Sequence, residues 1–277
     1  MKKIIWLTSF PKSGNTWMRH LLSNYYFNEE KVFDFYKSEK IKKFKVQKDF
    51  RKKIDKSDIV KSLNENSQYW IKSQENWKSE GDILFLKNHN ANVSFKNNFF
   101  TNDEISKAII YIVRDPRDVV ISASYFWKKS IDWVIEKICN DEYFTSINER
   151  DDTDFEFYST WKINFISWIY AKHTEKVPKI LIKYEDLLKD TNKEFNKILD
   201  FINKLNGEKT NISQLNFSVE NSQFKKLSHS ESKNNIENED KFFRSGKSNQ
   251  WINNLSQEQL RKIENSFKNE MRFLGYI

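Results

Sequence analysis

The stretch "LTSFPKSGNTW", Leu7 to Trp17, follows a short apolar run near the start of the chain. An apolar run, a polar loop containing glycine and then helix-forming residues are typical of a strand–loop–helix unit that binds phosphate. The first backbone N–H groups of a helix have no partner within it, and with the helix dipole they attract anions. We therefore expect the N–H groups around Ser13 to Thr16 to hold a phosphate.

This loop differs from the Walker loop, G-x-x-x-x-G-K-[ST], at two positions. If Gly14 and Thr16 are aligned with the second Gly and the hydroxyl residue, Ser9 stands at the first Gly and Asn15 at the Lys. A lysine occurs three residues before Asn15, at Lys12. The anion-binding elements are kept, but an ordinary nucleotide triphosphatase is a poor fit.

Four apolar runs have the character of buried strands and are separated by long stretches with helical patterns. They cover residues 3–9, 82–87, 108–113 and 179–184. Short runs that are apolar at nearly every position are typical of parallel strands covered on both faces. The sequence predicts an α/β fold, a single-domain P-loop-like parallel sheet over 1–277 with helices on both faces.

Helices are predicted over 15–26 and 157–170 from the spacing of their apolar residues. The polar stretch 228–241 has no apolar anchors and is predicted to be a mobile loop. Two capping boxes are expected to open helices: Thr191 with Glu194, and Ser256 with Gln259.

Composition indicates a globular protein with a polar surface. Charged residues make up 31% and the mean hydropathy is −0.79, but 16% of the 277 residues are aromatic, which gives a large area to bury. Cys139 is the single cysteine, so neither an internal disulfide nor a cysteine zinc site is expected. The N-terminal apolar run is too short for a signal peptide core, and no run is long enough to span a membrane. We expect a cytoplasmic protein.

The net charge of +8 is concentrated in residues 37–56, where ten Lys or Arg face three Asp or Glu. The segment is either a solvated face or a patch that steers an anionic ligand or lipid surface toward the protein. No nucleic-acid-binding motif accompanies the charge, so a nucleic-acid partner is not expected.

The sequence resembles the sulfotransferases that use 3′-phosphoadenosine 5′-phosphosulfate (PAPS). "PKSGNTW" resembles the family's 5′-phosphosulfate loop, PKSGTTW, with Asn15 for the first of two threonines. In the same order as in the family follow "FLKNHN", "YIVRDPRDVVIS", "KYEDLLKD", "SQFKKL" and "FFRSGKSNQW". Five further matches in order are far more specific than one short loop.

The resemblance implies a donor site that binds PAPS and releases adenosine 3′,5′-bisphosphate. It assigns the 5′-phosphosulfate to the first loop. It assigns the 3′-phosphate to an Arg and a Ser eight residues apart and to a late loop that covers the site. The adenine is assigned to aromatic and hydroxyl residues. The implied donor-binding residues are Lys12, Ser13, Gly14, Asn15, Thr16, Trp17, Arg114, Ser122, Tyr184, Ser222, Phe224, Arg244, Ser245 and Gly246.

The resemblance also places Lys87 and His89 in catalytic positions, beside Lys12. Sulfuryl transfer is similar to phosphoryl transfer, in which the protein positions the partners and stabilises charge. We expect Lys12 to stabilise the leaving oxygen, Lys87 the sulfuryl oxygens, and His89 to take the proton of the acceptor. Lysines and helix dipoles supply the positive field, so no metal is expected. His20 is expected on a helix face, and His173 and His229 at the surface.

The sequence departs from the family in three places. Ser245 replaces the middle Lys of the late R-K-G loop, although Lys247 is close enough to substitute. The C-terminal dimerisation motif has no convincing counterpart, which leaves the oligomeric state open. Residues 28–80, where elements that bind the acceptor are expected, match nothing in the family, which leaves a small alcohol, phenol, amine, lipid or sugar open as the acceptor.

Two other functions compete with sulfuryl transfer. A P-loop nucleotide or small-molecule kinase would need Mg²⁺ and a lysine at position 15, where Asn15 stands. A non-enzymatic protein that binds nucleotides or polyanions through 37–56 would keep the loop but would not need Lys87 and His89.

Overall fold

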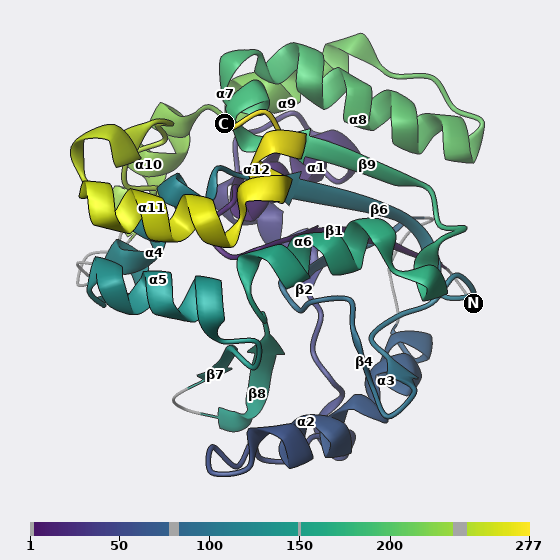
Figure 1. Ribbon diagram of the computed structural model, residues 1–277. Coiled ribbons are helices and arrows are strands. Elements are labelled where there is room, and N and C mark those ends of the chain that lie inside the picture. Colours follow the sequence, from purple (N-terminus) through teal and green to yellow (C-terminus); the bar gives the residue numbers. More distant parts are fainter. Residues whose placement is uncertain (1–2, 78–82, 149–150, 235–242) are drawn as a thin grey trace.

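A parallel sheet of five strands, in the order β2-β3-β1-β6-β9, forms the centre of the computed structural model (Figure 1). The structure describes residues 3–77, 83–148, 151–234 and 243–277. The strands of this sheet are β1 (Ile4–Ser9), β2 (Lys42–Lys43), β3 (Leu84–Asn88), β6 (Ser106–Val113) and β9 (Lys179–Lys183). All four predicted strands are present, and the α/β fold class is confirmed. The two-residue strand β2 was not predicted, because "KK" has no apolar pattern.

The central strand β1 pairs with β3 on one side and with β6 on the other, both in parallel. In parallel sheets the carboxyl ends of all strands lie at one edge, where ligands of open α/β sheets bind. The first loop follows β1, His89 follows β3, Arg114 follows β6 and Tyr184 follows β9. Topology therefore gathers at this edge four segments that are far apart in the sequence.

Alternate residues of β1 enter two different cores, one on each face of the sheet. Ile4 and Trp6 pack in the larger core, whereas Ile5 and Leu7 pack in the other. The larger core is covered by α4 (Pro116–Trp127), α5 (Ile131–Asn140), α6 (Trp161–Tyr170), α11 (Gln257–Ser266) and α12 (Lys268–Phe273). The opposite face is covered by α1 (Asn15–Tyr26), α7 (Tyr184–Lys189), α8 (Thr191–Asn206) and α9 (Ile212–Asn221). Figure 1 shows α6 crossing one face, with α1 behind the sheet.

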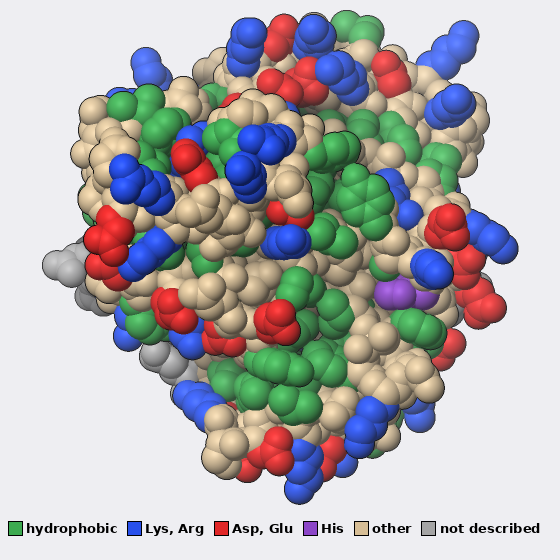
Figure 2. Space-filling model, in the orientation of Figure 1, with side chains coloured by type: hydrophobic (Ala, Val, Ile, Leu, Met, Phe, Trp, Pro, Cys, Tyr) green, Lys and Arg blue, Asp and Glu red, His purple; other side chains and the backbone are tan. Residues whose placement is uncertain are grey.

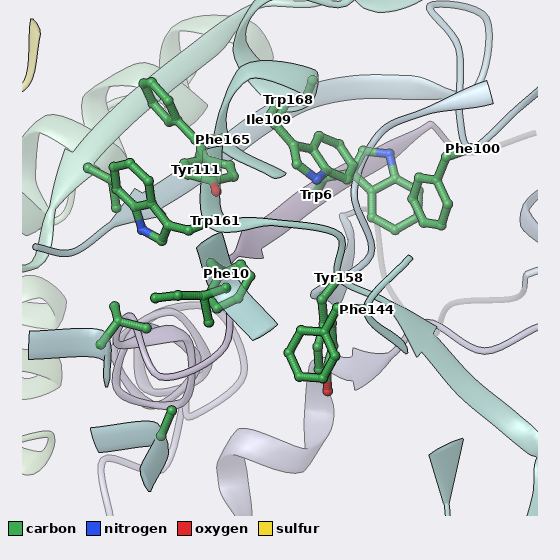
Figure 3. Close-up of a cluster of buried hydrophobic side chains, with 14 of the residues drawn as sticks. Trp6, Phe10, Phe100, Ile109, Tyr111, Phe144, Tyr158, Trp161, Phe165 and Trp168 are labelled. Carbon is green, nitrogen blue, oxygen red and sulfur yellow. The ribbon is translucent and has the colours of Figure 1, made fainter. Parts of the chain in front are cut away.

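The larger core is rich in aromatic rings, which accounts for the aromatic composition (Figure 3). The indole of Trp6 lies 5.7 Å from the ring of Phe44, 5.5 Å from Phe100 and 5.9 Å from Trp168, measured between centroids. Truncation of such a fully buried ring to alanine costs about 3–5 kcal/mol. These contacts fix the strand that carries the first loop.

The remaining elements lie outside the five-stranded sheet and its two covering layers. They are η1 (Phe35–Lys40), η2 (Lys48–Phe50), α2 (Ile59–Ser67), α3 (Trp70–Glu75), β4 (Ser94–Phe95), β5 (Asn98–Phe99), β7 (Thr145–Asn148), β8 (Asp151–Phe157), η3 (Lys172–Thr174), α10 (Phe224–Asn234) and η4 (Gln250–Asn253). β4 pairs with β5 and β7 with β8, both antiparallel. These hairpins were not predicted.

The helix predicted over 157–170 begins later than expected. Phe157 is the last residue of β8, and the helix α6 starts at Trp161 after Thr160, whose side chain accepts a hydrogen bond from the N–H of Ile163. A hydroxyl cap at Thr160 is a stronger start signal than the apolar spacing. The helix predicted over 15–26 has those bounds.

One of the two predicted capping boxes is confirmed. Ser256 and Gln259 cap each other reciprocally at the start of α11. At α8 the cap is Asp190, which accepts from the N–H of Lys193, while the hydroxyl of Thr191 donates to the carbonyl of Leu187 at 2.9 Å. The prediction for Thr191 was therefore wrong by one residue, since Asp is an equally good cap.

The stretch 228–241 is not a loop over its first part. Residues 228–234 belong to α10, and the rest of the predicted loop lies outside the described residues. Leu227 and Glu231, four residues apart, are both buried and anchor one face of this helix. A polar composition hid this pair of anchors.

Candidate active site

The first loop enters α1 through a glycine that no other residue could replace without strain. Gly14 caps α1 with φ 101° and, as a glycine, has no side chain that could cap the N–H groups of the first turn. A Cβ at Gly14 would lie 2.7 Å from Cδ2 of Tyr184. The N-cap residue therefore does not compete with an anion for the N–H groups of the first turn.

The side chain of Asn15 ties the start of α1 to β1. Its amide Nδ2 donates to the carbonyl of Leu7 at 3.2 Å and to the hydroxyl of Ser9 at 3.3 Å, and the residue is buried. Asn15, which stands at the position of the Walker lysine, therefore points into the protein and offers no positive charge to a bound phosphate.

A pocket of about 560 Å³, including its open mouth, lies beside this loop. It is lined by residues from the ends of β1, β6 and β9, from α4 and α10, and from the segment 243–250. The lining residues that the sequence predicted are Lys12, Gly14, Trp17, Arg114, Ser122, Tyr184, Phe224, Arg244, Ser245 and Gly246. Phe243 and Gln250 also line it and were missed, since each reads as an ordinary loop residue. Ser13, Asn15, Thr16 and Ser222 do not line it.

Four buried polar atoms at or beside the loop have no hydrogen-bond partner among the described residues: Oγ1 of Thr8, the hydroxyl of Ser13, Oδ1 of Asn15 and Nε of Arg114. A buried polar atom without a partner costs about 1–3 kcal/mol. A bound phosphate could accept from the Ser13 hydroxyl and from Nε–H of Arg114, and these two donors fit an anionic ligand.

Arg114 joins the two loops that border the pocket. Its guanidinium donates to the carbonyl of Lys12 at 3.1 Å and to the carbonyl of Lys247 at 2.9 Å. It also lies over the ring of Tyr184, at 4.4 Å from the centroid, and 3.8 Å from a carboxylate oxygen of Asp118. The side chain is thereby fixed before any ligand binds.

The segment after Phe243 covers the pocket, and Asp118 anchors it to α4. The carboxylate of Asp118 accepts from the backbone N–H groups of Asn249 at 2.8 Å and Trp251 at 3.2 Å. Gly246 has φ 60°, and a Cβ there would lie 2.4 Å from the ring of Phe224. The covering loop and the aromatic wall of the pocket are in direct contact at this glycine.

Trp17 is held by the backbone of residue 222. Its indole N–H donates to the carbonyl of Ser222 at 2.8 Å, and its ring meets that of Tyr184 edge-on at 5.9 Å. The hydroxyl of Ser222 accepts from the amide of Asn24 at 3.1 Å. Ser222 therefore lies behind the pocket wall, where it positions Trp17.

Lys12 has an unusual electrostatic environment. Its ammonium lies 4.0 Å from the centroid of the Phe126 ring. Burial, followed by repulsion from Arg114, lowers the pKa of Lys12 to about 7. In the free protein this lysine is therefore only partly protonated near neutral pH.

His89 is tied to the end of β1. Nδ1 of its ring donates to the carbonyl of Ser9 at 2.7 Å, since a carbonyl oxygen can only accept. This bond leaves Nε2 without a proton in the neutral ring. Burial, and then the charge of Lys87, lower the pKa of His89 to about 3. His89 is thus a neutral imidazole with an unprotonated Nε2.

Lys87 is buried in an ion-pair network that the sequence did not reveal. Its ammonium lies 3.4 Å from Oε1 of Glu156, and the ammonium of Lys43 lies 3.1 Å from Oε2 of the same carboxylate. Burial lowers the pKa of Lys87 to about 8, although Glu156 opposes that shift. Glu156 and Lys43 were missed because long-range ion pairs leave no local pattern.

The basic segment 37–56 is matched in part by acidic residues of β8. Lys45 pairs with Asp154 at 2.5 Å, Arg51 with Asp151 at 3.3 Å, and Lys53 with Asp152 at 3.1 Å. Figure 2 shows basic and acidic side chains interspersed on the face in view. The positive charge of this segment is thus used in part within the chain.

The other three histidines do not line the pocket, although His20 contacts its lining residue Phe243. His20, on α1, is buried between Phe35 and Phe243, and burial lowers its pKa to about 3. His173, expected at the surface, is instead half-buried, because its ring stacks on Phe99 and hydrogen-bonds with the side chain of Asn92. His229 is exposed on α10, as expected for a surface residue.

No helix within the described ranges is long and apolar enough to cross a membrane. The same ranges contain no cluster of three or more His, Cys, Asp or Glu that could hold a metal ion.

Comparison with known proteins places this site in a family. Residues 2–275 match the sulfotransferase domain, and the chain belongs to that family. It is 29% identical to sulfotransferase 2A1 of Macaca fascicularis over 214 residues, which cover 73% of this chain and 70% of the relative. It is also 29% identical over 212 residues to a 3-alpha-hydroxysteroid sulfotransferase of Cavia porcellus, covering 70% and 65% of the two chains.

Solved structures share the fold at lower identity. Retinol dehydratase in a complex with retinol and PAP aligns with a TM-score of 0.63 and 19% identity, over 98% of this chain and 82% of the other. Mouse sulfotransferase SULT7A1 in a complex with PAP aligns with a TM-score of 0.56 and 20% identity, over 98% and 84%. The resemblance that the sequence motifs indicated is confirmed.

Proposed function

We propose that residues 1–277 form one sulfotransferase domain that moves a sulfuryl group from PAPS to a hydroxyl group of a small-molecule acceptor. The observation that carries the proposal is the placement of Lys12, Arg114 and Gly246 around one pocket, although more than a hundred residues separate each from the next. Two structures that share the fold hold PAP, the product of this donor.

In this proposal the pocket holds the donor nucleotide. The N–H groups from Gly14 to Thr16 and the hydroxyl of Ser13 bind the 5′-phosphate, while the side chain of Asn15 fixes the loop to β1. The 3′-phosphate is bound by Arg114 and Ser122 and by the covering loop with Arg244, Ser245 and Gly246. A planar guanidinium and hydroxyl groups can donate directional hydrogen bonds to the phosphate oxygens. The adenine lies among Trp17, Tyr184 and Phe224, while Ser222 fixes Trp17.

When bound, the donor supplies an activated sulfuryl group and leaves as adenosine 3′,5′-bisphosphate. Lys12 stabilises the negative charge that grows on the leaving oxygen, which also favours the protonated lysine. Lys87 stabilises the oxygens of the group in transit. Nε2 of His89 takes the proton of the acceptor hydroxyl, while Ser9 holds the other ring nitrogen. Charge is stabilised by these side chains and by the start of α1, and the proposal requires no metal.

The acceptor is proposed to be a small alcohol, with hydroxysteroids as the first candidates. Relatives that carry sulfotransferase 2A and hydroxysteroid sulfotransferase names support this choice. We place the reaction in the cytoplasm, where the thiol of the single cysteine, Cys139, stays reduced.

The test is transfer of ³⁵S from labelled PAPS to a panel of 3α- and 3β-hydroxysteroids, phenols and amines, with EDTA present. We expect a labelled organic product with at least one hydroxyl acceptor. Transfer of ³²P from γ-labelled ATP that depends on Mg²⁺, with no ³⁵S product, would instead show a kinase. Asn15, turned inward and uncharged, argues against that outcome.

A further inference from the structure

Lys43 and Lys87 occupy paired positions on adjacent strands. They are register partners in the β2–β3 ladder, so their side chains point to the same face of the sheet. Like charges directly opposite each other destabilise a sheet. A buried carboxylate, Glu156 of β8, lies between them at 3.1 and 3.4 Å from the two ammonium groups.

We propose that Glu156 is a positioning residue that keeps the Lys87 ammonium charged and directed to the reacting group. This inference rests on the proposed function, in which Lys87 stabilises the sulfuryl oxygens. Lys87 lies in β3 and His89 follows the end of that strand, and the charges of Lys87 and Glu156 both act on the His89 ring. Glu156 approaches Lys87 from a separate hairpin, β7–β8, more than sixty residues later in the chain.

Both oxygens of Glu156 are already engaged. Oε1 pairs with Lys87, while Oε2 pairs with Lys43 and accepts from the hydroxyl of Tyr158 at 3.4 Å. Glu156 is 4% exposed. Its engaged oxygens and its burial fit a residue that acts through Lys87 and does not contact the acceptor.

The charge of Lys87 depends on the balance of its neighbours. Burial, Lys43 and Arg19 of α1 all lower its pKa, and Glu156 is the group that raises it. His89, which follows the end of the same strand, has a neutral ring and so adds no positive charge near Lys87. Without the carboxylate, an ammonium this buried would lose its proton at lower pH.

The experiment compares the pH dependence of kcat in four forms of the enzyme, with ³⁵S-labelled PAPS and the best hydroxysteroid acceptor. With saturating PAPS, whose phosphate keeps Lys12 protonated, activity should fall as pH rises through the pKa of Lys87, so the wild type has an alkaline limb. Glu156→Gln should move that limb to lower pH by about 1 unit or more, with little change in the KM for PAPS. Lys43→Met should move it to higher pH, because one repelling charge is lost. Asp154→Asn is the matched control, a buried carboxylate of β8 that pairs with Lys45 and Lys43, and should leave it unmoved.

A second readout separates the inference from the proposed function. Selective ¹⁵N labelling of lysine lets NMR follow the Lys87 ammonium directly, assigned by its loss in Lys87→Met. If no form transfers sulfate, the proposed function fails, and the Lys87 titration still decides whether Glu156 sets its charge. If Glu156→Gln does not fold, the opposite shift in Lys43→Met decides. The inference would be overturned if Glu156→Gln changed neither the alkaline limb of kcat nor the pH at which the Lys87 ammonium titrates. An equal shift in Asp154→Asn would also overturn it.

Discussion

The guanidinium of Arg114 donates to the main-chain carbonyl of Lys12 at 3.1 Å, across a sequence separation of 102 residues. This bond joins the end of β6 to the loop after β1, on the wall of the pocket. The second bond of Arg114, to the carbonyl of Lys247, reaches the covering loop. One side chain thus holds both loops that the proposal assigns to the donor.

Arg114→Ala is expected to weaken binding of adenosine 3′,5′-bisphosphate by about 10- to 100-fold, because each hydrogen bond to a charged group contributes about 1.5–3 kcal/mol. Calorimetric titration measures the Kd. The matched control is Arg51→Ala, which removes an arginine paired with Asp151 outside the pocket and should leave the Kd unchanged. An unaltered Kd in Arg114→Ala would remove this residue from the donor site.

Gly246→Ala should weaken binding about 10-fold, because its new Cβ would press on the ring of Phe224 at 2.4 Å and displace the covering loop. Gly207→Ala is the control. Gly207 also has a positive φ, 73°, but has nothing within 4 Å of a Cβ, so it should cost about 1 kcal/mol of stability and no affinity. Equal Kd values for the bisphosphate in the two variants would show that the contact between residue 246 and Phe224 does not control binding.

Lys12 is expected to take up a proton when bisphosphate binds. Its pKa of about 7 in the free protein means that the protonated fraction falls as pH rises through 7, and a bound anion restores it. At pH 8 the phosphates are already ionised, so proton uptake reports the lysine. Calorimetry in two buffers of different ionisation enthalpy measures this uptake, which should vanish in Lys12→Met. Uptake that persists in the variant would assign the proton elsewhere.

His89→Gln should lower kcat by about 10²- to 10⁴-fold while leaving the bisphosphate Kd unchanged, because the residue does not line the donor pocket. With a pKa of about 3, the ring should stay neutral down to about pH 5, which NMR of the imidazole can follow. His229→Gln, at an exposed position on α10, is the control and should retain full turnover. Full turnover in His89→Gln would exclude this histidine as the base.

The strands and the first loop could be predicted because their signal is local. The runs 3–9 and 108–113 are apolar at nearly every position, and Gly14 sits where a strand must turn into a helix. Asp190, by contrast, competes with Thr191 for the same cap, and the geometry of the turn selects it. Sequence spacing cannot separate two good caps that are adjacent.

The second half of the candidate site could not be predicted. Lys43 appeared as one cation in a basic segment, and Glu156 as one acid in a polar strand. Their pairing with Lys87 depends on the sheet register and on the docking of β8, both of which are set by tertiary packing. The motifs that matched the family therefore located Lys87 and His89 but not the charges around them.

Thermal unfolding with nucleotides tests the central claim most directly. In the absence of magnesium, adenosine 3′,5′-bisphosphate at 100 times its Kd should add about 2.7 kcal/mol of stability and raise Tm, while 5′-AMP and ADP, which lack the 3′-phosphate, should raise it much less. An equal shift with 5′-AMP, or a shift only with ATP and magnesium, would contradict the account.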